Sequence, residues 1–502
     1  MDIGITTVDE LPLRSAGAVT RRPIRRRRHG SYFGPRFWMA VIVAASALWI
    51  GFSTASARAI LLPALVMVDA AAIFFLVLYR RDRRLPVFEI GALWVFVVLV
   101  YSVYPLVNYY AAGLRWTIVS DNRLWAFDPG PEETGRFAWL YAICMIPFIV
   151  TYLIVRKRAC VTGTSTAPVS RARVTAVVLS FIGCGLLLVA VARYFGISYD
   201  PSYEDVAAER VATLTALPYL LQQVVHSVLS IRFLLLQIML FIAMRHWRDW
   251  KYRVAIVLFF AFEIGSSLYV RGARTNLTLL GITFVLLYHR LVRPLTLKIA
   301  LPAATVLLMA FNFIGLLRAG DYLDTMRNYD VPRLAAINEF QVVWGTSYDV
   351  YRRKQLGILG DVEWQLPFSD FYYLVPSQLL PFEKIDVQSW YLQKTGYDGG
   401  LMFGIVSQAL VGFGWKQLLL EGIFLGYIAA KLHRWYVKRA QRFWPLILYL
   451  FCCIWTYYSV RQTSLAVLSF IEYQFVPTLI MVELVRLLLQ RVHTHARRLI
   501  RG

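Results

Sequence analysis

Long apolar runs separated by short polar connectors dominate the chain. Each run is about 17 to 22 residues long, which as a helix crosses the roughly 30 Å hydrocarbon core of a bilayer. The runs lack the period-two alternation of a membrane-spanning strand. The pattern therefore predicts an all-α fold, a polytopic integral membrane helical bundle with about 12 transmembrane helices. The expected spans are residues 37–54, 59–79, 88–111, 137–155, 174–192, 223–244, 254–270, 275–289, 299–317, 417–432, 444–460 and 464–485.

Composition agrees with this class, since apolar residues make up 58% of the 502 residues and the mean hydropathy is +0.54. The formal net charge of +23 raises the alternative of a nucleic-acid-binding protein. However, connectors on one side of the expected bundle hold 34 of the 53 lysines and arginines, counting Lys431 at the end of its span. Basic residues are retained on the cytoplasmic side of a membrane. We therefore expect both termini in the cytoplasm and no nucleic-acid partner.

One large hydrophilic segment, 318–416, interrupts the spans on the outer side. Within it, 401–415 is apolar but short. If 401–415 crossed the membrane, the connector Lys431–Arg442 with its five basic residues would lie outside, against the charge rule. We therefore interpret 401–415 as a re-entrant or interfacial piece. The expected organisation is a disordered basic cytoplasmic N-terminus 1–36, an N-terminal transmembrane bundle 37–317, the loop domain 318–416, C-terminal transmembrane helices 417–485 and a basic cytoplasmic tail 486–502.

Cofactor and metal sites are not predicted. The five cysteines lie in or beside apolar runs, and none lies in the long outer loop. Their spacing matches no set of metal ligands, and disulfides are not expected.

Four arginines near the outer membrane face are candidates for binding an anion. Arg271 and Arg274 stand three residues apart at a tight join between two apolar runs, on the side where short loops normally avoid positive charge. Arg274 also begins the span 275–289, so helix N–H groups would point toward the same place, as in a diphosphate site. Arg318 and Arg461 lie at other outer span ends. The alternative for each is an interfacial anchor on lipid phosphates.

Acids of the outer loop are candidates for a general base. Asp398, beside the interfacial segment, is the best placed, and Glu339 is a second candidate. A solvated carboxylate is the ordinary alternative for both, as it is for the other acids of this loop, Asp349, Asp370, Glu383 and Asp386. The many Tyr and Trp residues of the loop suit either sugar faces or a membrane-interface belt.

Charged residues inside spans need partners. Arg232, Glu263, Glu421 and Glu472 lie within apolar runs, where an isolated charge is costly. A structural ion pair among them and a polar pocket that opens outward are both consistent with this pattern. Asp69 is a similar case.

Two stretches resemble a known family. One is Gly265–Arg274, a Ser- and Gly-rich run that ends in Arg-Gly before a span. The other is Gly399-Gly400, a short apolar helix through Ile405, and a Phe413-Gly414 turn. Together with the spans and the outer loop, they resemble the Wzy-type polysaccharide polymerases, the bacterial repeat-unit polymerases of O-antigen and exopolysaccharide.

The resemblance implies a multi-span, GT-C-like glycosyltransferase at the periplasmic face of the bacterial inner membrane. Its substrates would be undecaprenyl-diphosphate-linked oligosaccharide repeat units, joined by an inverting attack without a metal while arginines hold the diphosphate. Membrane lipids, a chain-length regulator and a flippase of the same pathway are the implied partners. The outer loop 318–416 is then periplasmic.

The chain departs from the family at Gln408, where many members have an acid, so no catalytic acid is expected there. Related O-antigen ligases place a histidine in the outer loop, and no histidine occurs between His289 and His433. The alternatives to the polymerase are a transporter or lipid-oligosaccharide flippase, motivated by the intramembrane charges, an O-antigen ligase, and a non-catalytic partner of an envelope assembly.

Overall fold

The computed structural model describes most of the expected spans and part of the outer loop. The described residues are 35–82, 86–111, 113–114, 129–156, 169–194, 219–269, 274–296, 299, 302, 305, 339–360, 365–372, 374–375, 379–385, 387–396 and 403–501. Within them every regular element is a helix, which confirms the all-α prediction. Nearly all of the predicted segment 1–36 and of the predicted span 299–317 lies outside the described residues.

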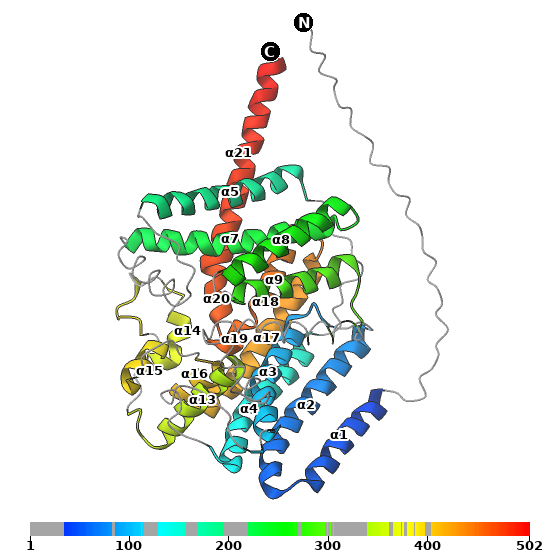
Figure 1. Cartoon of the computed structure of the whole chain (residues 1–502), viewed down its shortest axis with the longest axis vertical. Helices are drawn as coiled ribbons and strands as arrows, with labels where there is room; N and C mark the ends of the chain where they lie inside the picture. The colour runs from blue at the N-terminus through cyan, green and yellow to red at the C-terminus, as the bar shows by residue number, and fades with distance from the viewer. Residues whose placement is uncertain are drawn as a thin grey trace, which may run out of the picture.

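The helices follow one another along the chain as shown in Figure 1. The first part contains α1 Pro35–Phe52, α2 Ala55–Asp82, α3 Ile90–Ala111, α4 Pro131–Arg156, α5 Arg171–Tyr194, α7 Tyr219–Arg245, α8 Trp250–Tyr269, α9 Arg274–Leu287 and the π-helical turn η1 Tyr288–Val292. The second part contains α13 Glu339–Gln355, η2 Leu366–Phe368, α14 Ser369–Tyr372, α15 Val387–Thr395, α16 Ile405–Val411, α17 Trp415–Arg439, α18 Phe443–Trp455, α19 Tyr458–Arg461, α20 Ala466–Phe470, η4 Ile471–Phe475 and α21 Val476–Arg501.

Six helical stretches of the described residues are long and apolar enough to cross a membrane. They are Ala55–Asp82, Ile90–Ala111, Pro131–Arg156, Arg171–Val191, Ser227–Arg245 and Phe443–Arg461. Two shorter apolar helices, Met39–Phe52 and Leu279–Val292, accompany them. The chain is therefore a helical membrane protein, and the count of about 12 spans stays a prediction.

Glycines let α4 pack closely against its neighbours. A Cβ added at Gly422 of α17 would lie 2.2 Å from the carbonyl oxygen of Cys144, and one at Gly426 would lie 2.6 Å from that of Phe148. One added to Gly135 of α4 would lie 2.1 Å from the carbonyl oxygen of Ala59 on α2. Small residues spaced four apart are the usual way for membrane helices to approach at backbone distance. The pair Gly422 and Gly426 thus joins α17 to α4 along parallel axes.

The packed helices place their basic ends together. The last turns of α2, α4, α7 and α17 all carry Lys or Arg. Arg81 donates to the carbonyl of Leu153 at 3.1 Å, and Arg434 donates to that of Val155 at 3.4 Å, so α2 and α17 end beside the end of α4. Phe241, near the end of α7, contacts the first residue of α18. We call this the basic end of the bundle.

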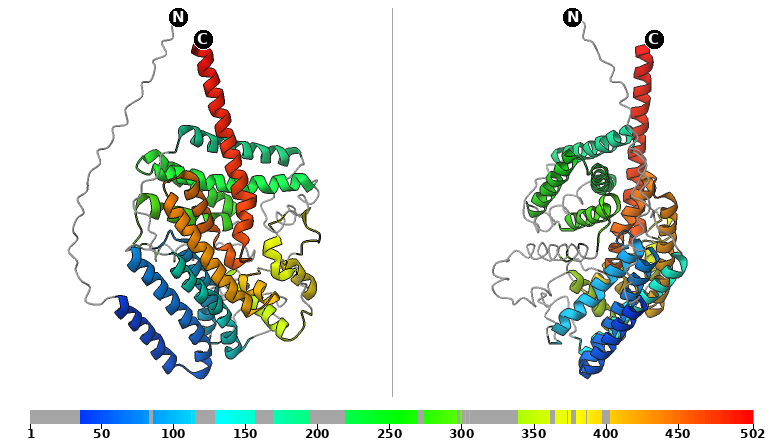
Figure 2. Two further views of the ribbon diagram at one scale, coloured as in Figure 1. Left: turned by 180° about the vertical axis from the view of Figure 1, so that it is seen from behind. Right: turned by 90° about the vertical axis from the view of Figure 1, so that its right-hand side faces the viewer.

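A second group of helices crosses the first at a steep angle. In Figures 1 and 2, α5 and α7 lie side by side and run across α21, while α1, α2 and α4 follow a common diagonal direction. Helix α21 extends beyond the rest of the bundle toward the C-terminus. Its Glu483 ties the two groups together, since it pairs with Arg173 of α5 at 2.9 Å and accepts from the indole of Trp444 on α18 at 2.6 Å.

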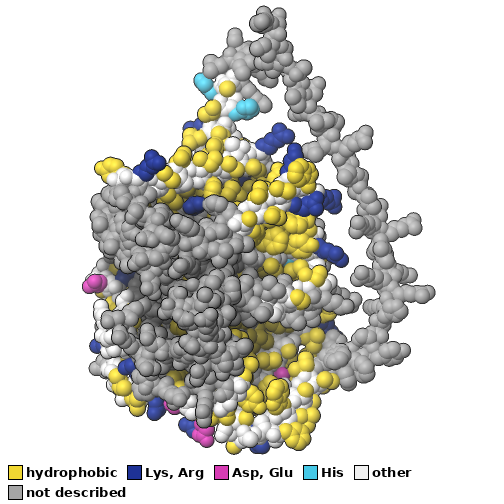
Figure 3. All heavy atoms as spheres, in the orientation of Figure 1, with side chains coloured by type: hydrophobic (Ala, Val, Ile, Leu, Met, Phe, Trp, Pro, Cys, Tyr) yellow, Lys and Arg dark blue, Asp and Glu magenta, His cyan; other side chains and the backbone are white. Residues whose placement is uncertain are grey.

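The outward sides of these helices are apolar. Figure 3 shows hydrophobic side chains over much of the described surface, with Lys and Arg in groups among them. Large exposed side chains include Leu186 at 66%, Val189 at 56% and Val257 at 66% exposure. In water such surfaces would be costly, whereas lipid chains cover them without penalty.

Two elements of the predicted outer loop pack onto the bundle at the end opposite to the basic one. Helix α13 places Trp344 edge-on to Phe137 at the start of α4, with ring centroids 4.7 Å apart, and Arg352 pairs with Glu133 at 3.1 Å. The apolar segment 401–415 contains α16, whose seven residues are all buried. A helix of this length covers only about 10 Å, so α16 cannot cross a bilayer.

Candidate functional site

The chain breaks directly after Arg461. Helix α18 continues through a single turn into α19, and the last residue of α19 is Arg461. Gln462 then takes φ −118° and ψ −116°, which is not helical, and α20 begins only at Ala466. The sequence placed Arg461 at the start of the last span, whereas it ends the helix before the break. A guanidinium at a helix C-terminus is favoured by the helix dipole.

Two tyrosine rings flank the guanidinium of Arg461. Its Cζ lies 5.6 Å from the ring centroid of Tyr457 and 5.2 Å from that of Tyr458. Residues three and four positions apart share one helix face, so this local geometry follows from the order Tyr-Tyr-Ser-Val-Arg. Aromatic rings attract a cation within about 6 Å. The two tyrosines therefore hold the positive charge of Arg461, which is partly exposed, at the end of the bundle.

The aromatic pair is anchored by rings from other helices. Tyr457 contacts Tyr101 of α3 with centroids 6.0 Å apart, and Tyr101 in turn contacts Phe340 of α13 at 5.0 Å. Tyr458 contacts Phe470 of α20 at 5.1 Å. Buried aromatic pairs contribute beyond their area alone. The site is thus built from the neighbouring helices α19 and α20 together with α3 and α13, which are distant from them in sequence.

Helix α16 fixes the segment that follows Arg461. The side-chain oxygen Oε1 of Gln408 accepts a hydrogen bond from the backbone N–H of Ser464 at 3.2 Å. Gly404, at the start of α16, lies so close to the chain that an added Cβ would be 3.0 Å from the carbonyl oxygen of Val460. Both contacts sit where a helix has ended and backbone groups need new partners. Gln408 therefore has a positioning role at the break.

Helix α13 holds α16 in turn. The hydroxyl groups of Ser347 and Ser407 are hydrogen-bonded at 2.7 Å. The ammonium group of Lys354 donates to the carbonyl of Gly412 at 2.9 Å and also to that of Leu410, which satisfies the C-terminal end of α16. Burial lowers the pKa of Lys354. Charge-assisted capping at this end keeps the short helix in place between α13 and the break.

The turn after α16 depends on glycine. Gly414 has φ +70° and ψ −139°, a conformation that other residues rarely adopt. The side chain of Gln417 accepts a hydrogen bond from the backbone N–H of Phe413 at 3.1 Å, and the ring of Phe413 is 60% exposed. The Phe413-Gly414 element noted in the sequence is therefore a tight turn that glycine allows, and it presents an aromatic ring at the surface.

Asp349 is buried and engaged within the outer layer. Its side chain accepts from Arg353 at 2.9 Å and from the hydroxyl of Tyr391 on α15, and the residue is only 2% exposed. Both donors bind the same oxygen, Oδ2, and a carboxylate that is this deeply buried is poorly placed to reach a substrate hydroxyl. We assign Asp349 the role of joining α15 to α13.

Some of the predicted site residues lie outside the described residues. These are Arg271, Arg318 and Asp398. Arg274 is the first residue of α9 and Glu339 is the first of α13. For these two residues the structure describes the backbone, and their side chains lie outside the described part.

The end of α9 is joined to the C-terminal helices. Arg290, just after α9, donates to Tyr436 at 3.2 Å, and Tyr436 stacks on Tyr449 in α18 with centroids 4.0 Å apart. The predicted placement of Arg274 beside Arg461 stays a prediction.

The intramembrane charges have local partners. Arg232 lies over the ring of Phe181 with its Cζ 5.5 Å from the centroid, and Glu421 accepts from Gln417 at 2.8 Å. Asp69 accepts from the hydroxyl of Ser46 at 3.0 Å. These contacts join neighbouring helices or successive turns of one helix, which lowers the cost of polar groups inside the membrane.

The sequence missed a buried ion pair at the basic end. Arg156, only 1% exposed, donates to Glu89 at 2.5 and 2.9 Å and also contacts Asp82, and Tyr152 donates to Glu89 at 2.7 Å. The signal was available, because Glu89 begins one predicted span and Arg156 directly follows another that runs the opposite way. The pair joins α3 to α4.

Within the described part of the chain, no group of three or more His, Cys, Asp or Glu residues could hold a metal ion. No family model matches the chain, and neither a curated protein nor a solved structure matches it.

Proposed function

We propose that the chain is a polymerase that joins undecaprenyl-diphosphate-linked oligosaccharide units into a surface polysaccharide at the periplasmic face of the bacterial inner membrane. The observation that supports this most directly is Arg461, held between Tyr457 and Tyr458 at a break between helices. A guanidinium at the edge of an apolar bundle suits the diphosphate of a lipid whose tail lies in the membrane. The resemblance of Gly265–Arg274 and of the stretch around Phe413 and Gly414 to the Wzy-type polymerases supports the same function.

The proposed reaction transfers a growing chain from its lipid carrier. A sugar hydroxyl of the acceptor attacks the anomeric carbon of the donor from the side opposite to the diphosphate. The new bond joins that hydroxyl oxygen to the carbon, the bond from the carbon to the diphosphate oxygen breaks, and the bonding electrons leave with the diphosphate. Arg461, with Arg271, Arg274 and Arg318 as further candidates, stabilises the negative charge that grows on the leaving group.

The hydroxyl proton passes to a general base. Asp398 and Glu339 remain the proposed candidates. Asp349 fits this role poorly because it is buried and its Oδ2 already accepts from Tyr391 and Arg353. A base must reach the reacting hydroxyl within hydrogen-bond distance, directly or through one water molecule.

The test is chain elongation by the purified protein supplied with lipid-linked repeat units in bilayers. We expect Arg461→Ala to lower the rate by about 10²- to 10³-fold, the usual effect of losing a group that stabilises transition-state charge. Arg461→Lys should retain part of the elongation rate because it keeps the positive charge. It should not reach the full rate, because lysine lacks the planar guanidinium that binds a phosphate with two hydrogen bonds. Arg136→Ala is the matched control, since Arg136 is an exposed residue near the start of α4 and its ion pair within the described residues is with the exposed Glu132. An unchanged rate of polymer formation by Arg461→Ala would rule out a role of Arg461 in stabilising the leaving diphosphate.

A transporter of lipid-linked oligosaccharides is the second candidate. The interrupted helix at Gln462 favours it, because transporters often bind substrates at breaks between helix halves. Arg232 inside the bundle is a further polar group of the kind that lines such paths. Vesicles that move labelled lipid-linked substrate across the bilayer without forming glycosidic bonds favour transport over polymerisation.

A further inference from the structure

The end of α21 has an exposed face that changes from apolar to basic along its length. Ile480, Leu484, Leu488 and Val492 follow one another at intervals of four residues and are 50%, 55%, 60% and 68% exposed. Residues four apart lie on nearly the same side of a helix. An apolar stripe therefore runs along the exposed side of α21, a helix that extends beyond the rest of the bundle (Figure 1).

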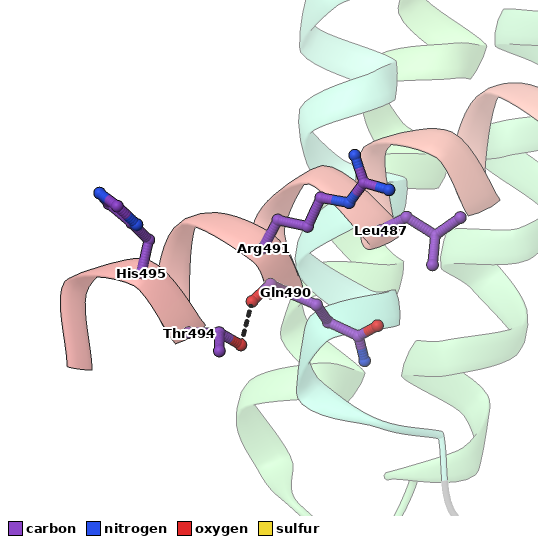
Figure 4. A pocket seen from close by; sticks show the side chains of 5 residues that line it. All are labelled: Leu487, Gln490, Arg491, Thr494 and His495. Atoms are coloured by element: carbon purple, nitrogen blue, oxygen red, sulfur yellow. Dashed lines mark hydrogen bonds between the residues drawn. The ribbon is translucent and has the colours of Figure 1, made fainter. Parts of the chain in front are cut away.

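Basic side chains lie beside the apolar stripe near the end of α21. Leu487, Gln490, Arg491, Thr494 and His495 line a shallow surface hollow of about 330 Å³ on this helix (Figure 4). Figure 4 shows Arg491 beside Leu487, with His495 one turn further on, while Gln490 and Thr494 project from another side. Thr494 bonds within the helix to the carbonyl oxygen of Gln490 at 2.8 Å.

The charge of this region has one sign. No Asp or Glu follows Glu483 in the sequence, whereas Arg486, Arg491, Arg497, Arg498 and Arg501 do. Glu483 itself is engaged by Arg173, Arg486 and Trp444. The terminal part of α21 is therefore a positively charged helix with an apolar stripe, at the basic end of the bundle.

We propose that the terminal part of α21, from Leu484 onward, is a docking surface for the anionic phospholipid headgroups of the adjacent membrane leaflet. Leu484 and Leu488 lie at the depth of the acyl chains, continuous with the lipid-facing side of the bundle. Arg491 and His495 bind headgroup phosphates one and two turns further on. The complementary charge and the unbroken stripe favour a lipid surface over a soluble acidic partner, which would meet only the basic part.

The test uses the full chain in lipid nanodiscs of two compositions, phosphatidylcholine alone and phosphatidylcholine with phosphatidylglycerol. Chymotrypsin cleaves after leucine, so the rate of cleavage near Leu488 and Leu489 reports access to this helix. We expect cleavage to be roughly tenfold slower with the anionic lipid, and high salt to remove most of the protection. Equal rates in the two nanodiscs would overturn the proposal.

Paired variants separate lipid binding from ordinary helix stability. In the anionic nanodisc, the double variant Arg491→Gln/His495→Gln should be cleaved at least about fivefold faster than the unmodified protein. Each arginine near an anionic surface contributes roughly that factor to binding. Gln490→Ala/Thr494→Ala is the matched control on the neighbouring, uncharged face of the helix and should keep this protection. Protection that persists in detergent without phospholipid overturns the proposal and assigns the stripe to another protein surface, such as a second copy. None of these outcomes depends on polysaccharide chemistry.

Discussion

The side chain of Gln408 accepts a hydrogen bond from the backbone amide of Ser464 at 3.2 Å, which joins a seven-residue buried helix to the break that follows Arg461. The sequence singled out Gln408 only as a departure from an acid. The structure places it where a break between helices needs an acceptor for a backbone N–H.

Substitution of Gln408 should therefore act through the break. We expect Gln408→Leu to remove this acceptor from the Ser464 amide and to cost about 1 to 3 kcal/mol. Elongation of lipid-linked units should fall while the protein still reaches the membrane. Gln408→Glu keeps an acceptor oxygen and should restore most of the activity, which a general packing defect would not allow. Thermal unfolding in detergent and the elongation rate are the two measurements.

The tyrosines beside Arg461 give a graded prediction. Tyr458→Phe keeps the ring and should bind a diphosphate lipid nearly as well as the unmodified protein. Tyr458→Leu removes the cation–π contact and should weaken binding by about 0.5 to 2 kcal/mol. Isothermal titration with a lipid diphosphate measures this difference. Equal weakening by both variants would mean that the hydroxyl group, rather than the ring face, supports Arg461.

The buried carboxylate of Asp349 should be structural. Asp349→Asn removes a countercharge from Arg353, which is itself only 14% exposed at its side chain, so we expect a loss of about 3 to 5 kcal/mol. Tyr391→Phe removes a single neutral donor and should cost less, about 1 to 3 kcal/mol.

A double-mutant cycle tests the coupling of these two residues. The combined variant should be less destabilised than the sum of the two single variants, because both act on one hydrogen bond. Additive losses in thermal unfolding contradict a direct contact between Asp349 and Tyr391.

Backbone contact between α4 and α17 predicts a position-specific effect of alanine. Gly422→Ala places a Cβ 2.2 Å from the carbonyl oxygen of Cys144, so the helices must separate, and the cost should be about 1 to 3 kcal/mol or more. Gly183→Ala in α5 is the matched control, since no described atom lies within 4 Å of the added Cβ. It should be neutral or stabilise by up to about 1 kcal/mol. Melting temperatures in one detergent compare the two.

Much of the candidate site was accessible from local sequence alone. The order Tyr-Tyr-Ser-Val-Arg predicts that Tyr457 and Tyr458 flank Arg461 once the segment is helical, because the spacing is three and four residues. The apolar but short segment 401–415 predicts a helix that does not cross, and α16 is too short to do so. Arg274 at a helix start follows from the apolar run after it. These are local properties, decided by neighbours along the chain.

Partners distant in sequence could not be derived in this way. Gln408 and Ser464 are 56 residues apart, and Glu89 and Arg156 are 67 apart. Many polar residues could satisfy each of these groups, and only the packing of the helices selects one. The sequence considered ion pairs among Arg232, Glu421 and other charges within spans. The contacts that the structure describes are Arg232 over the ring of Phe181 and Glu421 with Gln417.

By itself the sequence determined the all-helical class, the membrane environment and the grouping of basic residues at helix ends, because the length and polarity of each run are set residue by residue. Tertiary structure decided which helices touch at Gly422 and Gly426 and which side chains meet at Arg461. Those contacts depend on the crossing of whole helices, where a shift of one residue changes every partner along the interface.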